Sequence, residues 1–157
     1  MNSREKSKKE KVQIEVEVGA RKLHVTHATC PKGHALRDNE VKIHREPSLK
    51  VKARIRGKEG FLYLDPVYGR YDNIEKDIKI KDGDVVQMFC PECGMDLRDS
   101  EETCQLCSAP MFIFHLPGGG IVEGCTRKGC LFHKMKIVDA EKQFARMFEN
   151  NTLESYL

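Results

Sequence analysis

The spacing of seven cysteines is the feature that most restricts what this chain can fold into. Cys90 and Cys93 form one C-x2-C pair, and Cys104 and Cys107 form a second pair that begins after ten intervening residues. Two such short loops can place four thiolates tetrahedrally around one zinc ion. The sequence therefore predicts a first metal site made of these four cysteines.

The three remaining cysteines need a histidine if they are to complete a second four-ligand site. Cys30, Cys125 and Cys130 are the thiols, and His34 or His133 can supply the imidazole. We favour His34 because it shares a Cys-Pro-x-Gly-type turn with Cys30, and His133 stays open as the alternative. The chain then has eight ligands for two Zn²⁺ ions. The competing interpretation is three buried thiols with two surface histidines.

The charge of the chain is concentrated at its beginning. The formal net charge is +3, and residues 1–11 hold five basic and two acidic side chains, so the rest of the chain is balanced. This balance argues against a general electrostatic affinity for nucleic acid. The sequence has no apolar run long enough for a membrane span and no secretion signal at its start. We therefore expect a cytoplasmic protein without a membrane partner, in which cysteines bind metal rather than form disulfides.

Alternating apolar residues predict a mainly β fold of the α+β class, with antiparallel hairpins. The expected strands are residues 12–18, 22–29, 49–55, 61–64, 111–116 and 131–138, with a further hairpin over residues 78–89. A single helix is expected over residues 139–149, where Asp139 can cap the N-terminus and apolar residues recur at helical spacing.

The predicted ligands also suggest the domain organisation. Residues 1–11 are expected to be a disordered basic tail, and residues 150–157 a C-terminal tail. A metal that joins Cys30 to Cys125 would close a long loop, which makes residues 12–149 one interlocked domain. Within it, residues 88–116 are expected to form a protruding zinc ribbon.

Residues 90–107 resemble a zinc ribbon built from two rubredoxin-type knuckles. The resemblance covers the segments Cys-Pro-Glu-Cys-Gly and Cys-Gln-Leu-Cys, and it implies a bound metal and a local fold but no particular function. Ser108 stands where a glycine is common in such knuckles. This departure favours zinc over the iron of a rubredoxin-like electron carrier, which is kept as an alternative.

One basic strand suggests a way of binding nucleic acid. Lys50, Lys52, Arg54 and Arg56 fall on every second residue, about 6.6 Å apart, which is similar to the spacing of phosphates along an extended strand. Phe61, Tyr63, Tyr68 and Tyr71 follow and could stack on bases. The plainer interpretation is an exposed strand face whose charges are neutralised by neighbouring glutamates.

An enzymatic role is the other alternative to a binding role. The cluster of Cys30, His34, Cys125 and Cys130 would have to keep one metal position open for water, with His133 or His115 nearby. Thiolate-rich zinc is a weak Lewis acid, and no catalytic residue has a recognisable partner. The sequence therefore predicts a non-catalytic zinc-binding adaptor or accessory protein, whose partner is a protein or a nucleic acid, with no small-molecule substrate identified.

Overall fold

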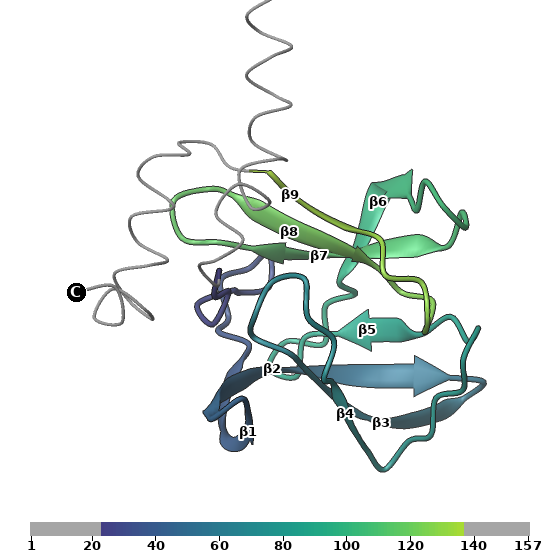
Figure 1. Ribbon diagram of the computed structural model, residues 1–157, viewed down its shortest axis with the longest axis horizontal. Coiled ribbons are helices and arrows are strands. Elements are labelled where there is room, and N and C mark those ends of the chain that lie inside the picture. Colours follow the sequence, from purple (N-terminus) through teal and green to yellow (C-terminus); the bar gives the residue numbers. More distant parts are fainter. Residues whose placement is uncertain (1–22, 137–157) are drawn as a thin grey trace, which may run out of the picture.

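Two antiparallel β-sheets make up the computed structural model, which describes residues 23–136 (Figure 1). The first sheet contains β1 (Arg37–Ile43), β2 (Glu46–Ile55), β3 (Lys58–Leu64), β4 (Ile74–Lys76) and β5 (Gln87–Phe89). The second contains β6 (Arg98–Thr103), β7 (Pro110–His115), β8 (Ile121–Cys125) and β9 (His133–Lys136). There is no helix among these described residues. The prediction of a mainly β fold with antiparallel pairing is confirmed.

Strand β2 organises the first sheet. One edge of β2 pairs along its length with β3, from Leu49 opposite Leu64 to Ile55 opposite Lys58. β1 pairs with the first half of β2, and β5 pairs with the second half. Apolar side chains on β2 are buried and alternate with partly exposed lysine and arginine side chains, as the period-two pattern predicts.

The second sheet is a meander in which β6, β7, β8 and β9 follow one another both in sequence and in space. In such a sheet, successive turns lie at opposite ends and alternate turns lie at the same end. The β6–β7 turn and the β8–β9 turn therefore share one end. The segment that enters β6 lies at the other end, next to the β7–β8 turn.

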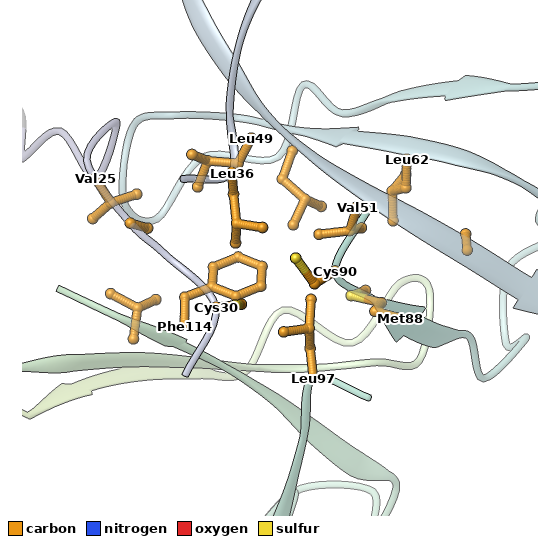
Figure 2. Packing of buried hydrophobic residues seen from close by; sticks show 14 of the residues in the cluster. Val25, Cys30, Leu36, Leu49, Val51, Leu62, Met88, Cys90, Leu97 and Phe114 are labelled. Atoms are coloured by element: carbon orange, nitrogen blue, oxygen red, sulfur yellow. The ribbon is translucent and has the colours of Figure 1, made fainter. Parts of the chain in front are cut away.

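The hydrophobic core lies between the two sheets (Figure 2). Leu49, Val51 and Leu62 point from the first sheet toward Phe114 of the second, and each of these side chains is at least nine-tenths buried. Cys90 lies within the same cluster, at 1% exposure. Cys90 is also one of the predicted metal ligands. Its thiol therefore connects the hydrophobic core to the predicted metal site.

Several sequence predictions are corrected by the structure. Residues 23–29 do not form a strand: His24 makes one isolated bridge and Thr29 makes two, on either side of a turn in which the Ala28 N–H donates to the Val25 carbonyl at 3.0 Å. The predicted hairpin over residues 78–89 is also wrong. Its turn at residues 82–83 exists, but β5 pairs with β2 because the Met88 side chain is buried against that sheet.

Four strands, β1, β4, β6 and β8, were not predicted, and the first three have mostly polar sequences. β1, β4 and β6 each have side chains that are largely exposed or partly exposed, so the period-two signal is absent from their sequences. The predicted strand over residues 12–18, the helix over residues 139–149 and both tails lie outside the described residues. None of the elements within residues 23–136 is a helix able to cross a membrane.

Gly60 on β3 is a position where the fold requires the absence of a side chain. A Cβ atom there would lie 2.5 Å from the Lys76 carbonyl oxygen and 2.6 Å from Ile78 Cβ. We expect Gly60→Ala to lower the free energy of unfolding by about 1–3 kcal/mol, because backbone must move to make room. Urea unfolding measures the change. Lys58→Ala, an exposed site on the same strand, is the control, and equal stability of the two variants would contradict the prediction.

Candidate metal centres

Four short turns carry all the cysteines, and each turn closes with a backbone hydrogen bond from the residue that opens it. The Cys30 N–H donates to His34 O at 2.9 Å, and the Cys90 N–H donates to Met95 O at 2.9 Å. The Cys104 N–H donates to Ala109 O at 2.7 Å. In the fourth turn, the Cys125 N–H donates to Phe132 O at 2.9 Å. We call these turns knuckles 30–34, 90–95, 104–109 and 125–132.

A left-handed backbone residue follows the second cysteine in two of these knuckles. Gly94 has φ of 74°, as expected of a glycine at this point. Ser108 occupies the equivalent place with φ of 66°, although it carries a side chain. The serine that departs from the common pattern therefore adopts the glycine-like conformation, at an expected cost of about 1 kcal/mol.

The first group of metal-ligand side chains consists of Cys30, His34, Cys90 and Cys93, whose ligand atoms all lie within 4.8 Å of one another. Cys30 Sγ lies 3.3 Å from His34 Nδ1 and 4.0 Å from Cys93 Sγ. Cys30 and Cys90 are buried, while Cys93 is exposed. We call this set the first group.

The second group consists of Cys104, Cys107, Cys125 and Cys130, again with all sulfurs within 4.8 Å of one another. Cys104 Sγ lies 3.7 Å from Cys130 Sγ, and Cys107 Sγ lies 3.4 Å from Cys125 Sγ. The Arg127 Nε–H donates to Cys107 Sγ at 3.4 Å, which places a positive charge beside the four sulfurs. This set is the second group.

These distances fit a tetrahedral metal ion and do not fit disulfides. A zinc ion with Zn–S bonds of about 2.3 Å holds neighbouring sulfurs about 3.8 Å apart. A disulfide requires about 2.05 Å between sulfurs, and all seven cysteines are free. Each group offers four donors, so both Cys-rich groups can hold a metal ion.

Local hydrogen bonding changes the acidity of two thiols. Burial raises the pKa of Cys30, but hydrogen bonds from His34 outweigh this effect and lower the pKa to about 7. Hydrogen bonds from the Ala109 backbone and from Arg127 lower the pKa of Cys107 to about 6. Burial instead raises the pKa of Cys90 and of Cys125. Each group thus holds one thiol that readily supplies the thiolate form that metals bind.

The predicted ligands are the ones brought together, but the predicted pairing of the knuckles is corrected. Knuckle 90–95 joins knuckle 30–34, and knuckle 104–109 joins knuckle 125–132. The reason is that β6 runs extended between Cys93 and Cys104, and its six residues span about 20 Å. One ion cannot reach both ends of that strand. The observed pairing follows from the antiparallel order of β6 to β9. Knuckles 104–109 and 125–132 are alternate turns of this sheet, and alternate turns lie at the same end.

His133, the alternative ligand, lies outside both groups. Its ring packs edge-on against Tyr68, with ring centroids 4.7 Å apart, and the Tyr71 hydroxyl contacts its Nδ1. His34 is the histidine in the first group. The two tyrosines had been considered as stacking surfaces for bases, and the structure instead packs both against His133.

Sequence reasoning missed a histidine–carboxylate cluster on the first sheet. His44 Nε2 lies 2.8 Å from Asp65 Oδ2 and 3.2 Å from Asp72 Oδ2. Asp65 Oδ1 accepts the Val67 N–H at 2.9 Å, and Oδ2 also accepts the Asp72 N–H at 3.1 Å. These bonds tie the loop after β3 to the β1–β2 turn, so the cluster has a structural explanation. No sequence spacing indicates it.

A second acidic cluster is built around Glu123, which is fully buried. Burial and the neighbouring Asp99 raise the pKa of Glu123 to about 7. Lys134 and Lys136 each place an ammonium 3.8 Å from Glu123 Oε1, and both also pair with Glu102. Because the lysines already supply positive charge, this cluster is a charge network rather than a cation site.

The predicted basic row consists of three residues on β2 and Arg56 in the turn that follows, and it is largely occupied by contacts within the protein. Lys52 and Arg54 both pair with Glu59 across the hairpin, at 3.1 and 2.5 Å. Arg56 pairs with Asp84 at 2.9 Å. Lys50 places its ammonium 4.4 Å from the centre of the Phe61 ring. The sequence left open whether neighbouring carboxylates neutralise this row. Three of the four cations are paired with a carboxylate in the structure.

Comparisons of the chain with protein-family models, with curated proteins and with solved structures each found no match. The geometry of the two groups is therefore the basis for assigning a role.

The observed pairing makes a direct prediction for cysteine variants. Cys30→Ala with Cys90→Ala removes two ligands from one group, so we expect loss of one metal ion per chain. Cys90→Ala with Cys107→Ala damages both groups, so we expect loss of both ions. Native mass spectrometry counts the ions in each variant. If Cys90→Ala with Cys107→Ala loses one ion, those cysteines share a site and the grouping described above is wrong.

Proposed function

We propose that this protein is a non-catalytic zinc-binding adaptor that uses two structural Zn²⁺ ions to hold a protein-binding surface. The donor sets support this role: four sulfurs in the second group, and three sulfurs with one imidazole in the first. Closed sets of this kind are typical of structural zinc, whereas catalytic zinc keeps an open position. Zinc is preferred over iron because the first group has a Cys3His donor set, which is typical of structural zinc, while four sulfurs as in the second group suit either metal.

The observation that carries the proposal is where exposed apolar side chains gather. Among residues 23–136, the large apolar residues with the greatest exposure are Leu106 at 73% and Leu131 at 56%. Leu106 lies between Cys104 and Cys107, and Leu131 directly follows Cys130. Both therefore belong to knuckles of the second group. A metal ion in that group would fix the positions of both leucines.

Two neighbours extend this surface. The Tyr71 side chain is 40% exposed, and its hydroxyl donates to the Leu131 carbonyl at 2.8 Å. Val85 is 36% exposed and bridges to Arg127 in the same knuckle. We call Tyr71, Val85, Leu106 and Leu131 the knuckle surface. Exposed apolar residues that gather around a rigid site mark protein-interaction surfaces more often than isolated ones do.

A hydrogen bond to a cysteine sulfur holds the backbone of Leu106 in place. The Leu106 N–H donates to Cys104 Sγ at 3.3 Å, so the thiolate orients the residue that presents the leucine side chain. Pre-ordering of this kind reduces the entropy that a partner must overcome on binding. The proposed zinc therefore acts through the shape of the surface and not through chemistry at the ion.

The knuckle surface predicts a sharp effect of two substitutions. We expect Leu106→Ser with Leu131→Ser to keep both metal ions but to weaken binding of a purified partner at least about thirtyfold, as loss of apolar anchors does. The partner is first recovered by affinity capture, and binding is then measured with purified proteins by calorimetry. Ile74→Ser, an exposed apolar residue on β4, is the matched control. Unchanged affinity in the double variant would overturn the proposal.

Nucleic-acid binding through β2 is the second candidate, favoured by the partly exposed row of Lys50, Lys52 and Arg54 on one face of this strand. Because Glu59 already pairs with Lys52 and Arg54, we expect only weak binding of single-stranded RNA or DNA. We also expect Lys52→Glu with Arg54→Glu to leave that binding unchanged at fixed salt. Fluorescence anisotropy measures it. If the unmodified protein binds tightly and this variant abolishes the binding, the nucleic-acid proposal replaces the protein-partner proposal.

A further inference from the structure

We propose that the cavity between the two sheets binds a small amphipathic carboxylic acid, with its apolar body inside and its carboxylate at Arg70. The cavity has a volume of about 330 Å³. Sites for small organic molecules typically begin near this size and are mostly apolar with a few polar groups. Two ligands of the second group, Cys125 and Cys130, lie at its edge, and the rest of its lining belongs to the core and the surrounding loops.

The inner wall of the cavity is aliphatic and aromatic, and it is supplied by both sheets. The lining side chains include Leu49, Leu62 and Leu64 from the first sheet and Phe112, Phe114 and Val122 from the second. All but Phe112 belong to the buried core, and Phe112 packs against it. Burial of an alkyl or aryl group there is favourable by about 25 cal/mol per Å² of apolar area. The body of the ligand should therefore be a hydrocarbon.

The outer rim of the cavity is built from two segments that contact each other. One is the loop after β3, which contributes Tyr68, Arg70 and Tyr71, and the other is knuckle 125–132 together with His133. The Tyr71 hydroxyl donates to the Leu131 carbonyl at 2.8 Å, and the Tyr68 and His133 rings meet edge to face. These contacts hold the rim in shape, so the cavity is formed before a ligand arrives.

Arg70 is the rim cation that is most available to an acid. Its guanidinium lies 3.7 Å from Asp72, which is beyond hydrogen-bonding distance, and its side chain is 46% exposed. The other two rim cations are engaged: Lys128 pairs with Glu75 at 2.8 Å, and Arg127 donates to Gly83 O at 2.9 Å. A carboxylate can take two parallel hydrogen bonds from a guanidinium.

Asp72 is the carboxylate that competes for Arg70, at 3.7 Å, and it also pairs with His44 at 3.2 Å. The acidic residues that line the cavity have other neighbours. Asp65 is held by His44 at 2.8 Å, and Glu75 is held by Lys128. Glu123 lies within its network of lysines, and Asp82 is exposed on its turn. Asp65 and Glu75 each pair with a cation of their own. Neither carboxylate is therefore left unpaired to repel an anion that binds Arg70.

The test uses the full zinc-loaded chain and decanoate, a ten-carbon acid, with 1-decanol as the probe that lacks a charge. We expect saturable binding of decanoate by calorimetry. Methyl-labelled protein should show chemical-shift changes at Leu62, Leu64 and Val122 and none at Leu106. Arg70→Gln should weaken decanoate about tenfold and leave decanol unchanged, because only the acid loses a charge-assisted bond. Arg98→Gln, an exposed arginine on β6, is the matched control.

Three results would overturn the proposal: no saturable binding of decanoate, shift changes away from the cavity methyls, or equal effects of Arg70→Gln on the acid and the alcohol. Arg70 is on the surface, so its variant should fold, and thermal melting confirms this before binding is measured. The outcome does not depend on the adaptor role, because the ligand is tested at Arg70, whereas partner binding is tested at Leu106, which does not line the cavity, together with Leu131, which does.

Discussion

The first group of metal ligands joins two turns from distant parts of the chain, and the second group joins two turns at one end of the second sheet. In the first group, Cys30 lies beside Cys93, and 63 residues of sequence separate them. In the second, Cys104 lies beside Cys130, at a separation of 26 residues. Closing loops of these lengths costs chain entropy, and a bound metal would offset that cost at two points. The two groups therefore add long-range connections to those made by the core between the sheets.

The position of the two groups follows from chain direction. β7 runs from knuckle 104–109 toward His115, which pairs with Thr29 next to Cys30. One strand therefore connects the neighbourhoods of both groups. Cys90 belongs to the core cluster as well as to the first group, so a change in metal occupancy there would be felt by Leu97, Phe114 and the residues packed around them.

The sequence identified the ligand residues better than it identified their arrangement. Cysteine spacing and a histidine in a Cys-Pro-x-Gly turn were enough to choose the eight side chains, because turn chemistry is local. The pairing of knuckles depends on which ends of strands meet, and β6 has no apolar alternation by which it could be recognised. Strands such as β2, with one buried face, were predicted well for the opposite reason. The cavity and the His44 cluster arise from contacts between distant segments, which no local pattern encodes.

The strands at the borders of the sheets have a consequence for how the protein behaves at high concentration. β1 has a register shift between Asp38 and Lys42, β4 has three residues, and β6 carries charged side chains along an irregular pairing with β7. Unpaired backbone on such borders is a poor template for another chain, because bulges and charge prevent a continuous ladder from extending. Intermolecular β-sheet growth toward fibrils should therefore be disfavoured along these three strands.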